Sequence, residues 1–133
     1  MVGLASLSKD AAFALGVDLY EGNGLPVDYE KGVRAFHRAA ELGIPEAAFN
    51  LGLAYYVGKG VKADPVQAMR WLKIGAEGSF ARAAFMVGIL YARGDVGPAD
   101  KDQAILYLRR AEELGDEEAG MLADAIADGA VPY

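Results

Sequence analysis

Residues that could carry out chemistry are scarce in this chain. Among its 133 residues there is one histidine and no cysteine, which excludes thiol catalysis, disulfides and cysteine-rich metal sites. His37 shares the polar side of a predicted helix with Arg34, Arg38 and Glu41. A general base also needs a nucleophile to activate and an enclosing pocket, and the sequence indicates neither. We therefore expect no enzymatic activity, no cofactor and no metal.

Charge limits the kind of partner that the chain can bind. The net charge is −6, from 13 basic and 19 acidic side chains, and residues 111–128 hold seven acids and no base. Phosphate binding needs a basic stripe, so this end disfavours nucleic acid. We interpret the acidic segment as a solvated capping face. The alternative is an acidic patch that steers a basic partner.

A basic strip on the second helix of each repeat is the other charged feature. Glu41, Glu77 and Glu113 alternate with its bases and dilute it, so we expect no binding to nucleic acid or to membrane surfaces. The bases of this strip are Arg34, Arg38, Arg70, Lys73, Arg109 and Arg110. No run of the sequence approaches the roughly 20 apolar residues of a membrane-spanning helix.

The elements that must position these residues recur every 36 residues. The segments AAFALG, AAFNLG, AAFMVG and AGMLAD begin at Ala11, Ala47, Ala83 and Ala119, with no insertion or deletion between them. Such a period predicts a repeat architecture. We divide the chain, a single domain over 1–133, into a leader, repeats 11–46, 47–82 and 83–118, and a terminal half repeat 119–133.

The first helix of each repeat is predicted from apolar residues four apart, as at Ala47, Leu51 and Tyr55. A glycine at the sixth position of the repeat costs roughly 1 kcal/mol of helix propensity, so its recurrence indicates close approach of a neighbouring helix. Glycine-rich turns then end the helix. The recurring sixth-position glycines are Gly16, Gly52 and Gly88.

The second helix is predicted to begin after a recurring aspartate, Asp28, Asp64 or Asp100, which suits the N-cap position. Gln67 and Gln103 stand at capping-box spacing from the last two aspartates. Pairs four apart on the polar side, such as Arg109 with Glu113, favour the helix. Trp71, the one tryptophan, occupies a position where Tyr107 recurs, and we expect it in the core.

Short helix pairs bury their apolar faces only by stacking, and about three repeats are needed for independent stability. The predicted fold is therefore all-α: a right-handed α-α solenoid of three 36-residue helix-loop-helix repeats plus a C-terminal half repeat. Met121, Leu122 and Ile126 in the half repeat have no second helix to cover them. Either residues 131–133 fold back as a cap or another chain supplies the cover.

The repeat resembles the Sel-1-like repeat family, relatives of the tetratricopeptide repeat. Its pattern is A-x-x-x-L-G-x-x-Y-x-x-G-x-G-V-x-x-D-x-x-x-A-x-x-W-x-x-x-x-A-E-x-G. The first repeat departs from it with Leu19, Gly32 and Ala35, and the third with Val96. The best match is the middle repeat, with Ala47, Leu51, Gly52, Tyr55, Gly58, Gly60, Val61, Asp64, Ala68, Trp71, Ala76 and Glu77.

The resemblance implies a protein-interaction role, because similar proteins act as adaptors in signalling, protein quality control, envelope polysaccharide systems and host contact by bacteria. Secreted relatives that staple each repeat with a disulfide are not matched, since this chain has no cysteine. Relatives called β-lactamases or penicillin binders are not matched either, because no nucleophile and base are paired here.

The candidate binding surface is the side of the first helices that turns away from their core positions, which a curved stack would place on its concave face. An apolar groove there suits an extended peptide or a helix. Val17, Leu53 and Ile89 have the alternative of packing between adjacent first helices. The candidate partner-binding residues are Tyr20, Asn50, Leu53, Tyr56, Met86, Ile89 and Arg93.

The sequence therefore predicts a scaffold that binds a segment of another protein on this concave face. The alternative is a structural or self-assembling repeat segment of a larger protein, with no ligand of its own. We expect a monomer or weak self-association through the half repeat. The start of the chain, Met1 to Leu7, lacks the length and basic residues of a signal peptide. A soluble cytoplasmic location is favoured, or a periplasmic one if the N-terminus was trimmed.

Overall fold

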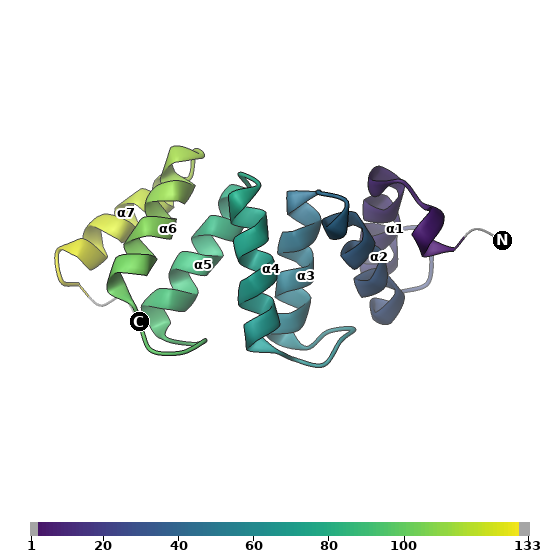
Figure 1. Ribbon diagram of the computed structural model, residues 1–133, viewed down its shortest axis with the longest axis horizontal. Coiled ribbons are helices and arrows are strands. Elements are labelled where there is room, and N and C mark those ends of the chain that lie inside the picture. Colours follow the sequence, from purple (N-terminus) through teal and green to yellow (C-terminus); the bar gives the residue numbers. More distant parts are fainter. Residues whose placement is uncertain (1–2, 131–133) are drawn as a thin grey trace.

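The computed structural model describes residues 3–130, and within them the chain forms a short 3-10 helix, seven α-helices and no strand (Figure 1). Six of the α-helices have 13 residues each, and the last has 11. The elements are η1 (Leu4–Ser6), α1 (Lys9–Glu21), α2 (Tyr29–Glu41), α3 (Pro45–Val57), α4 (Pro65–Glu77), α5 (Ala81–Arg93), α6 (Lys101–Glu113) and α7 (Glu117–Ala127).

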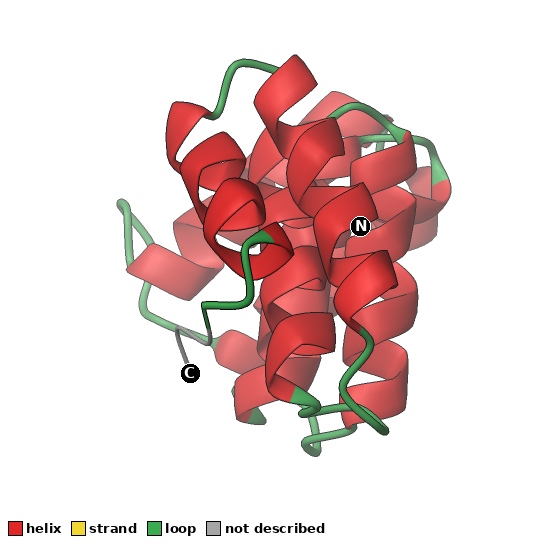
Figure 2. Ribbon diagram, turned by 90° about the vertical axis from the view of Figure 1, so that its left-hand side faces the viewer, coloured by secondary structure: helices red, strands yellow, loops and turns green. Residues whose placement is uncertain are grey.

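The helices form antiparallel pairs that stack in chain order along one axis, with α1 and α7 at opposite ends of the row (Figure 1). Helices α1 and α2, α3 and α4, and α5 and α6 pack as pairs, and α7 packs on α6. Figure 2, seen along the row, shows only helices and their loops. The predicted α-solenoid is confirmed.

The sixth-position glycines let the two helices of a repeat touch. A Cβ built on Gly52 would lie 2.7 Å from Cγ of Leu72, and one on Gly88 would lie 2.7 Å from Cγ of Leu108. Both leucines are fully buried. The predicted close approach is therefore confirmed, and it occurs between the two helices of the same repeat.

The predicted aspartate caps are present, but the capping box is not. The Asp64 carboxylate accepts hydrogen bonds from the backbone N–H groups of Val66 and Gln67, at 3.1 and 3.2 Å. In a capping box the Gln67 side chain would accept a hydrogen bond from the backbone N–H of Asp64. That N–H instead donates to the carbonyl of Tyr55 at 2.9 Å. The prediction of a reciprocal box was wrong because this N–H ties α4 back to the end of α3.

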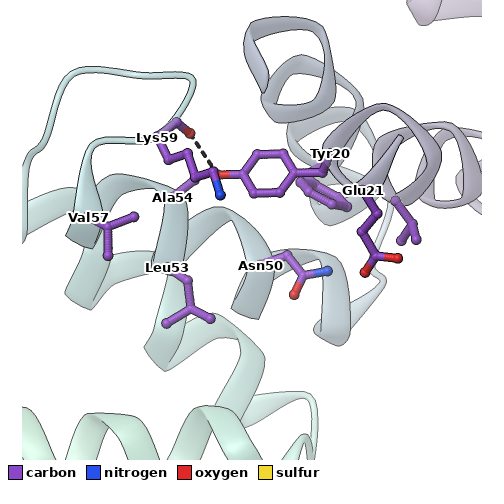
Figure 3. Close-up of a pocket in the computed structure, with 9 residues that line it drawn as sticks. Tyr20, Glu21, Asn50, Leu53, Ala54, Val57 and Lys59 are labelled. Atoms are coloured by element: carbon purple, nitrogen blue, oxygen red, sulfur yellow. Dashed lines mark hydrogen bonds between the residues drawn. The ribbon is translucent and has the colours of Figure 1, made fainter. Parts of the chain in front are cut away.

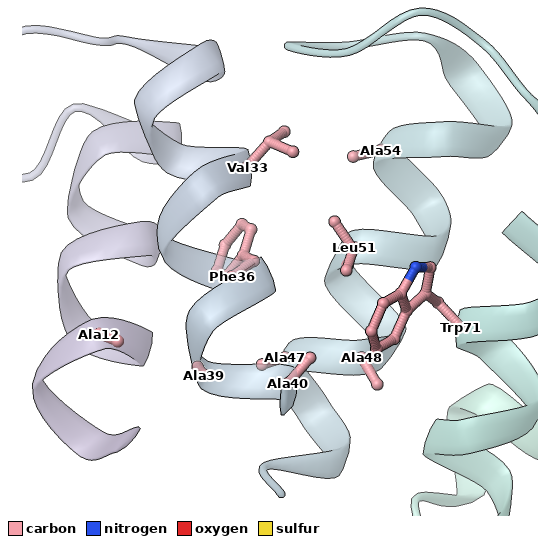
Figure 4. Close-up of a cluster of buried hydrophobic side chains, with 10 residues drawn as sticks. All are labelled: Ala12, Val33, Phe36, Ala39, Ala40, Ala47, Ala48, Leu51, Ala54 and Trp71. Atoms are coloured by element: carbon pink, nitrogen blue, oxygen red, sulfur yellow. The ribbon is translucent and has the colours of Figure 1, made fainter. Parts of the chain in front are cut away.

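Small residues make the core, as Figure 4 shows for the first cluster. Ala47, Ala48 and Leu51 are fully buried, and Trp71 is 6% exposed, which confirms it as a core residue. In contrast, Ala11 is exposed although its repeat position is buried in Ala47. In the second repeat the preceding helix pair covers this position. Before α1 there is only the short 3-10 helix, which does not cover Ala11.

The turn from a second helix to the next first helix requires a left-handed residue. Gly43 and Gly115 adopt φ values of 97° and 106° there, and Ser79, at the equivalent position of the second repeat, adopts 69°. Because a side chain disfavours this conformation, Ser79 holds local backbone strain.

The end of the stack is better covered than the sequence predicts. Of the three residues expected to lack a covering second helix, Ile126 is 6% exposed and Leu122 is half-buried against the last core cluster, whereas Met121 is 72% exposed. The proposed cap, Val131 to Tyr133, lies outside the described residues.

Arg109 does not form the predicted pair with Glu113. It pairs with Glu112 and with Asp124 of α7, and the pair with Asp124 strengthens the α6–α7 junction.

Candidate functional site

The predicted binding residues lie on α1, α3 and α5, the first helices of the three repeats. Residues three, four and seven positions apart share one side of a helix, which relates Asn50, Leu53 and Val57 on α3. The structure brings Tyr20, Asn50 and Leu53 together around one cavity of about 280 Å³ between α1 and α3 (Figure 3).

The cavity is mainly apolar. Figure 3 shows Asn50 and Leu53 on α3 and the ring of Tyr20 reaching across from α1 toward Lys59. Glu21 and Lys59 are the charged lining residues, and they offset one another. Such a lining can enclose an apolar side chain while the amide bonds a neighbouring polar group. The remaining lining residues are Val17, Phe36, Ala54 and Val57.

Tyr20 forms a fixed wall of this cavity. Its hydroxyl donates to the carbonyl of Lys59 at 2.8 Å, and the Lys59 ammonium lies 4.4 Å from the centre of the Tyr29 ring. Burial, and then the proximity of Tyr29, raise the pKa of Tyr20 above its ordinary value. The ring of Tyr20 is therefore available for contact while its hydroxyl is already bonded within the protein.

Tyr56 repeats this arrangement one unit later. Its hydroxyl donates to Oδ2 of Asp95 at 3.0 Å, and Nε of Arg93 lies 3.3 Å from the same oxygen. Burial, and then the hydrogen bond to Asp95, raise the pKa of Tyr56. Tyr56 and Arg93 thus meet at the loop after α5, and neither lines the cavity that holds Tyr20. The third repeat has Ala92 at this position.

Met86 and Ile89 complete the predicted set. Ile89 is 8% exposed, which fits the alternative that it packs between helices. Met86 is half-buried and lines a second cavity of about 230 Å³, which lies among α3, α5 and the start of α7. The other residues around this cavity are Phe49, Arg82, Phe85, Asp116 and Glu118.

Sequence reasoning missed this second cavity. Phe49 and Phe85 stand 36 residues apart, in the segments AAFNLG and AAFMVG that defined the repeat. Their recurrence was a signal for an aromatic row, but the core assignment followed the residues four apart, as at Ala47, Leu51 and Tyr55, and left this row out. The contribution of Asp116 and Glu118 comes from stacking α7 next to α5, which the period alone does not show.

The structure describes possible metal ligands in residues 3–130. No group of three or more histidine, cysteine, aspartate and glutamate side chains there could hold a metal ion. Nor is any helix in that range long and apolar enough to cross a membrane. His37 pairs with Glu41 on α2, and its ring stands edge-on to Trp71 at 5.1 Å, so its contacts are structural.

A stack of antiparallel helix pairs defines the class of α-solenoid repeat proteins. Within that class, the model of the Sel1 repeat matches residues 9–44, 45–80 and 81–116, and the chain belongs to this family. The match has the predicted period but begins each repeat two residues earlier. Sel1 repeats commonly mediate protein–protein interactions, and the family is generally non-catalytic.

Solved structures show the same architecture. A Sel1 repeat protein from Oxalobacter formigenes is 32% identical with a TM-score of 0.81, over 84% of this chain and 46% of that one. The c5321 protective antigen of uropathogenic Escherichia coli is 30% identical with a TM-score of 0.84, over 92% and 26%. This chain thus matches less than half the length of either protein.

A third structure, the cysteine-rich protein B of Helicobacter pylori, is 21% identical with a TM-score of 0.74, over 86% of this chain and 88% of that one, and supports the fold alone. All three proteins are bacterial, which points to a bacterial origin for this chain. A comparison with curated proteins found no match.

Proposed function

We propose that this chain is a scaffold that binds a segment of another protein on the side formed by its first helices. The observation that supports this most strongly is the cavity between α1 and α3, about 280 Å³ in volume and lined mainly by apolar side chains. Pockets of this kind hold an apolar group and orient it with a few polar contacts.

Two interactions would hold the segment. An apolar side chain of the partner packs between Val17 and Leu53, where full burial of a leucine-sized group contributes about 1.5–3 kcal/mol. The Asn50 amide both donates to and accepts from the partner's backbone, contributing about 1 kcal/mol. Tyr20 is already held by its bond to Lys59, so binding costs little ordering of that wall.

The test uses a displayed library of short random peptides as the probe. Peptides selected on the wild-type protein are synthesised, and their affinities are measured by isothermal titration. We expect Leu53→Glu to weaken binding by more than about tenfold and Asn50→Ala by about fivefold. Circular dichroism and thermal melting establish that each variant is folded.

Leu106 on α6 offers a matched control, since it is an exposed leucine that does not line the cavity. Leu106→Glu introduces the same side chain and charge and should bind the peptides as the wild type does. Equal affinities of the Leu53→Glu and wild-type proteins would refute the site. If no peptide is selected at all, the proposed function itself fails.

The second candidate is a structural or self-assembling segment of a larger protein, favoured by Met121, which is 72% exposed on α7. Sedimentation velocity over a range of concentrations tests this. A wild-type protein that self-associates and a Met121→Glu variant that does not would support it. A strict monomer would refute assembly through this end.

A further inference from the structure

We infer that the bound segment is basic: it places a lysine or arginine in the cavity formed by Phe49, Phe85, Asp116 and Glu118, close to the apolar side chain held between α1 and α3. This inference rests on the proposed function and assigns the chemistry of the partner. We call the cavity between α1 and α3 the apolar cavity and the one beside α7 the acidic cavity.

The two cavities share helix α3, which lines the apolar cavity through Asn50 and Leu53 and the acidic cavity through Phe49. Phe49 and Leu53 are four residues apart, about 6 Å along the axis, and neighbouring helices are separated by about 8–10 Å. The cavities are therefore on the order of 10 Å apart, which about three extended residues span.

The acidic cavity has the chemistry of a cation site. The rings of Phe49 and Phe85 and the thioether of Met86 form an apolar lining, and the carboxylates of Asp116 and Glu118 come from the start of α7. A side chain with an apolar stem and a cationic head fits both parts, because its stem packs on the rings while its head reaches the carboxylates.

The charge around the acidic cavity has the matching sign. Arg82 is its one basic lining residue, so two carboxylates against one guanidinium leave one net negative charge. The surrounding residues 111–128 contain seven acids and no base. Arg109, which precedes this run, is paired with Glu112 and Asp124, two of the seven acids, and none of these three residues lines the cavity.

The apolar cavity differs, because Glu21 and Lys59 balance one another. This contrast gives the partner a direction: its apolar residue lies toward α1 and its basic residue toward α7. The negative field at the α7 end also attracts a basic segment before contact is made, and salt screens that attraction.

The experiment compares Glu118→Lys with Glu117→Lys. Both residues are exposed glutamates in the first turn of α7, but only Glu118 lines the cavity, so the two variants share net charge and helix position. The probes are the peptides selected on the wild-type protein, together with copies in which each lysine or arginine is changed to glutamine.

The expected result has three parts. The selected peptides are enriched in a lysine or arginine about three residues from an apolar one. Their affinity falls about five- to tenfold in Glu118→Lys and less than about twofold in Glu117→Lys, and changing the basic residue to glutamine removes this difference. Wild-type affinity also decreases as sodium chloride is raised.

Failure of this inference is distinct from failure of the proposed function. Peptides that require Leu53 but show no basic enrichment and bind Glu118→Lys normally would overturn the basic partner and leave the binding face in place. Equal losses in Glu117→Lys and Glu118→Lys would also overturn it, since net charge and not the cavity would then be responsible. Peptides indifferent to Leu53→Glu would overturn both.

Discussion

Replacing Gly52 by alanine tests how the two helices of a repeat pack. In an exposed helix this change stabilises by about 1 kcal/mol, because alanine has the better helix propensity. At Gly52 the new Cβ would lie 2.7 Å from Cγ of Leu72, 2.9 Å from its Cδ2 and 3.1 Å from the carbonyl oxygen of Ala68. Neither neighbour can move easily, since Leu72 is fully buried and the other atom is backbone.

The magnitude follows from these opposing effects. Overpacking a close-packed core costs about 1–3 kcal/mol, and fixed neighbours place Gly52 in the upper part of that range. After the gain in propensity, we expect Gly52→Ala to lower the free energy of unfolding by about 1–2 kcal/mol, which corresponds to a fall in Tm of about 3–8 °C. The assay is urea unfolding followed by circular dichroism, with thermal melting alongside.

Gly120→Ala on α7 is the matched control, because it is also a helical glycine with a close neighbour. That neighbour is the side chain of Glu112, which is 45% exposed and can rotate away by giving up its exposed pair with Arg109, a pair that contributes little. We expect Gly120→Ala to leave stability unchanged or to raise it by up to about 1 kcal/mol. The reasoning would be refuted by a Gly52→Ala protein at least as stable as the wild type.

Three further changes act at single contacts. Ser79→Gly removes a side chain from a backbone with φ of 69° and should raise the free energy of unfolding by about 0.5–1 kcal/mol in urea titration; a loss would contradict the strain. Asp100→Ala removes the cap on the Gln103 N–H and should cost about 1 kcal/mol, with Asp100→Asn recovering most of it. Tyr56→Phe removes the hydrogen bond to Asp95 and should cost about 1 kcal/mol at pH 7. The pKa of Tyr56 is raised in the folded state from about 10. The stability that its hydroxyl contributes therefore decreases as pH rises above 10. A difference in the free energy of unfolding between wild type and Tyr56→Phe that stays constant to higher pH would count against this bond.

Sequence reasoning recovered the fold because each local signal recurred in register. The glycine facing Leu72 and the aspartate before α4 act through neighbours within one repeat. The 36-residue period then brings the same contacts back in each repeat. A structural signal found in one repeat could therefore be checked at the same position of the next repeat. The errors arose where a partner depends on how the chain folds back and not on the repeat spacing, as with the Asp64 N–H, which bonds the carbonyl of Tyr55 in the same repeat.

The binding face was predicted less completely for the same reason. Helical spacing placed Tyr20, Asn50 and Leu53 on one side, and the structure assembles them around a cavity. Spacing did not show that the Tyr20 hydroxyl is already bonded to the loop of the next repeat. It also could not assign Asp116 to a cavity with Phe49, because that contact depends on how successive repeats stack.

The tyrosine bonds between repeats have a mechanical consequence. Tyr20 joins α1 to Lys59, and Tyr56 joins α3 to Asp95, so in both cases the end of a first helix is fastened to the loop of the following repeat. Ala92 has no hydroxyl to do this for α5, and the last junction combines the apolar packing of α7 on α6 with the exposed pair of Arg109 and Asp124. Because a tyrosine bond fastens each of the first two junctions but not this one, we expect the α7 end to yield first under a pulling force.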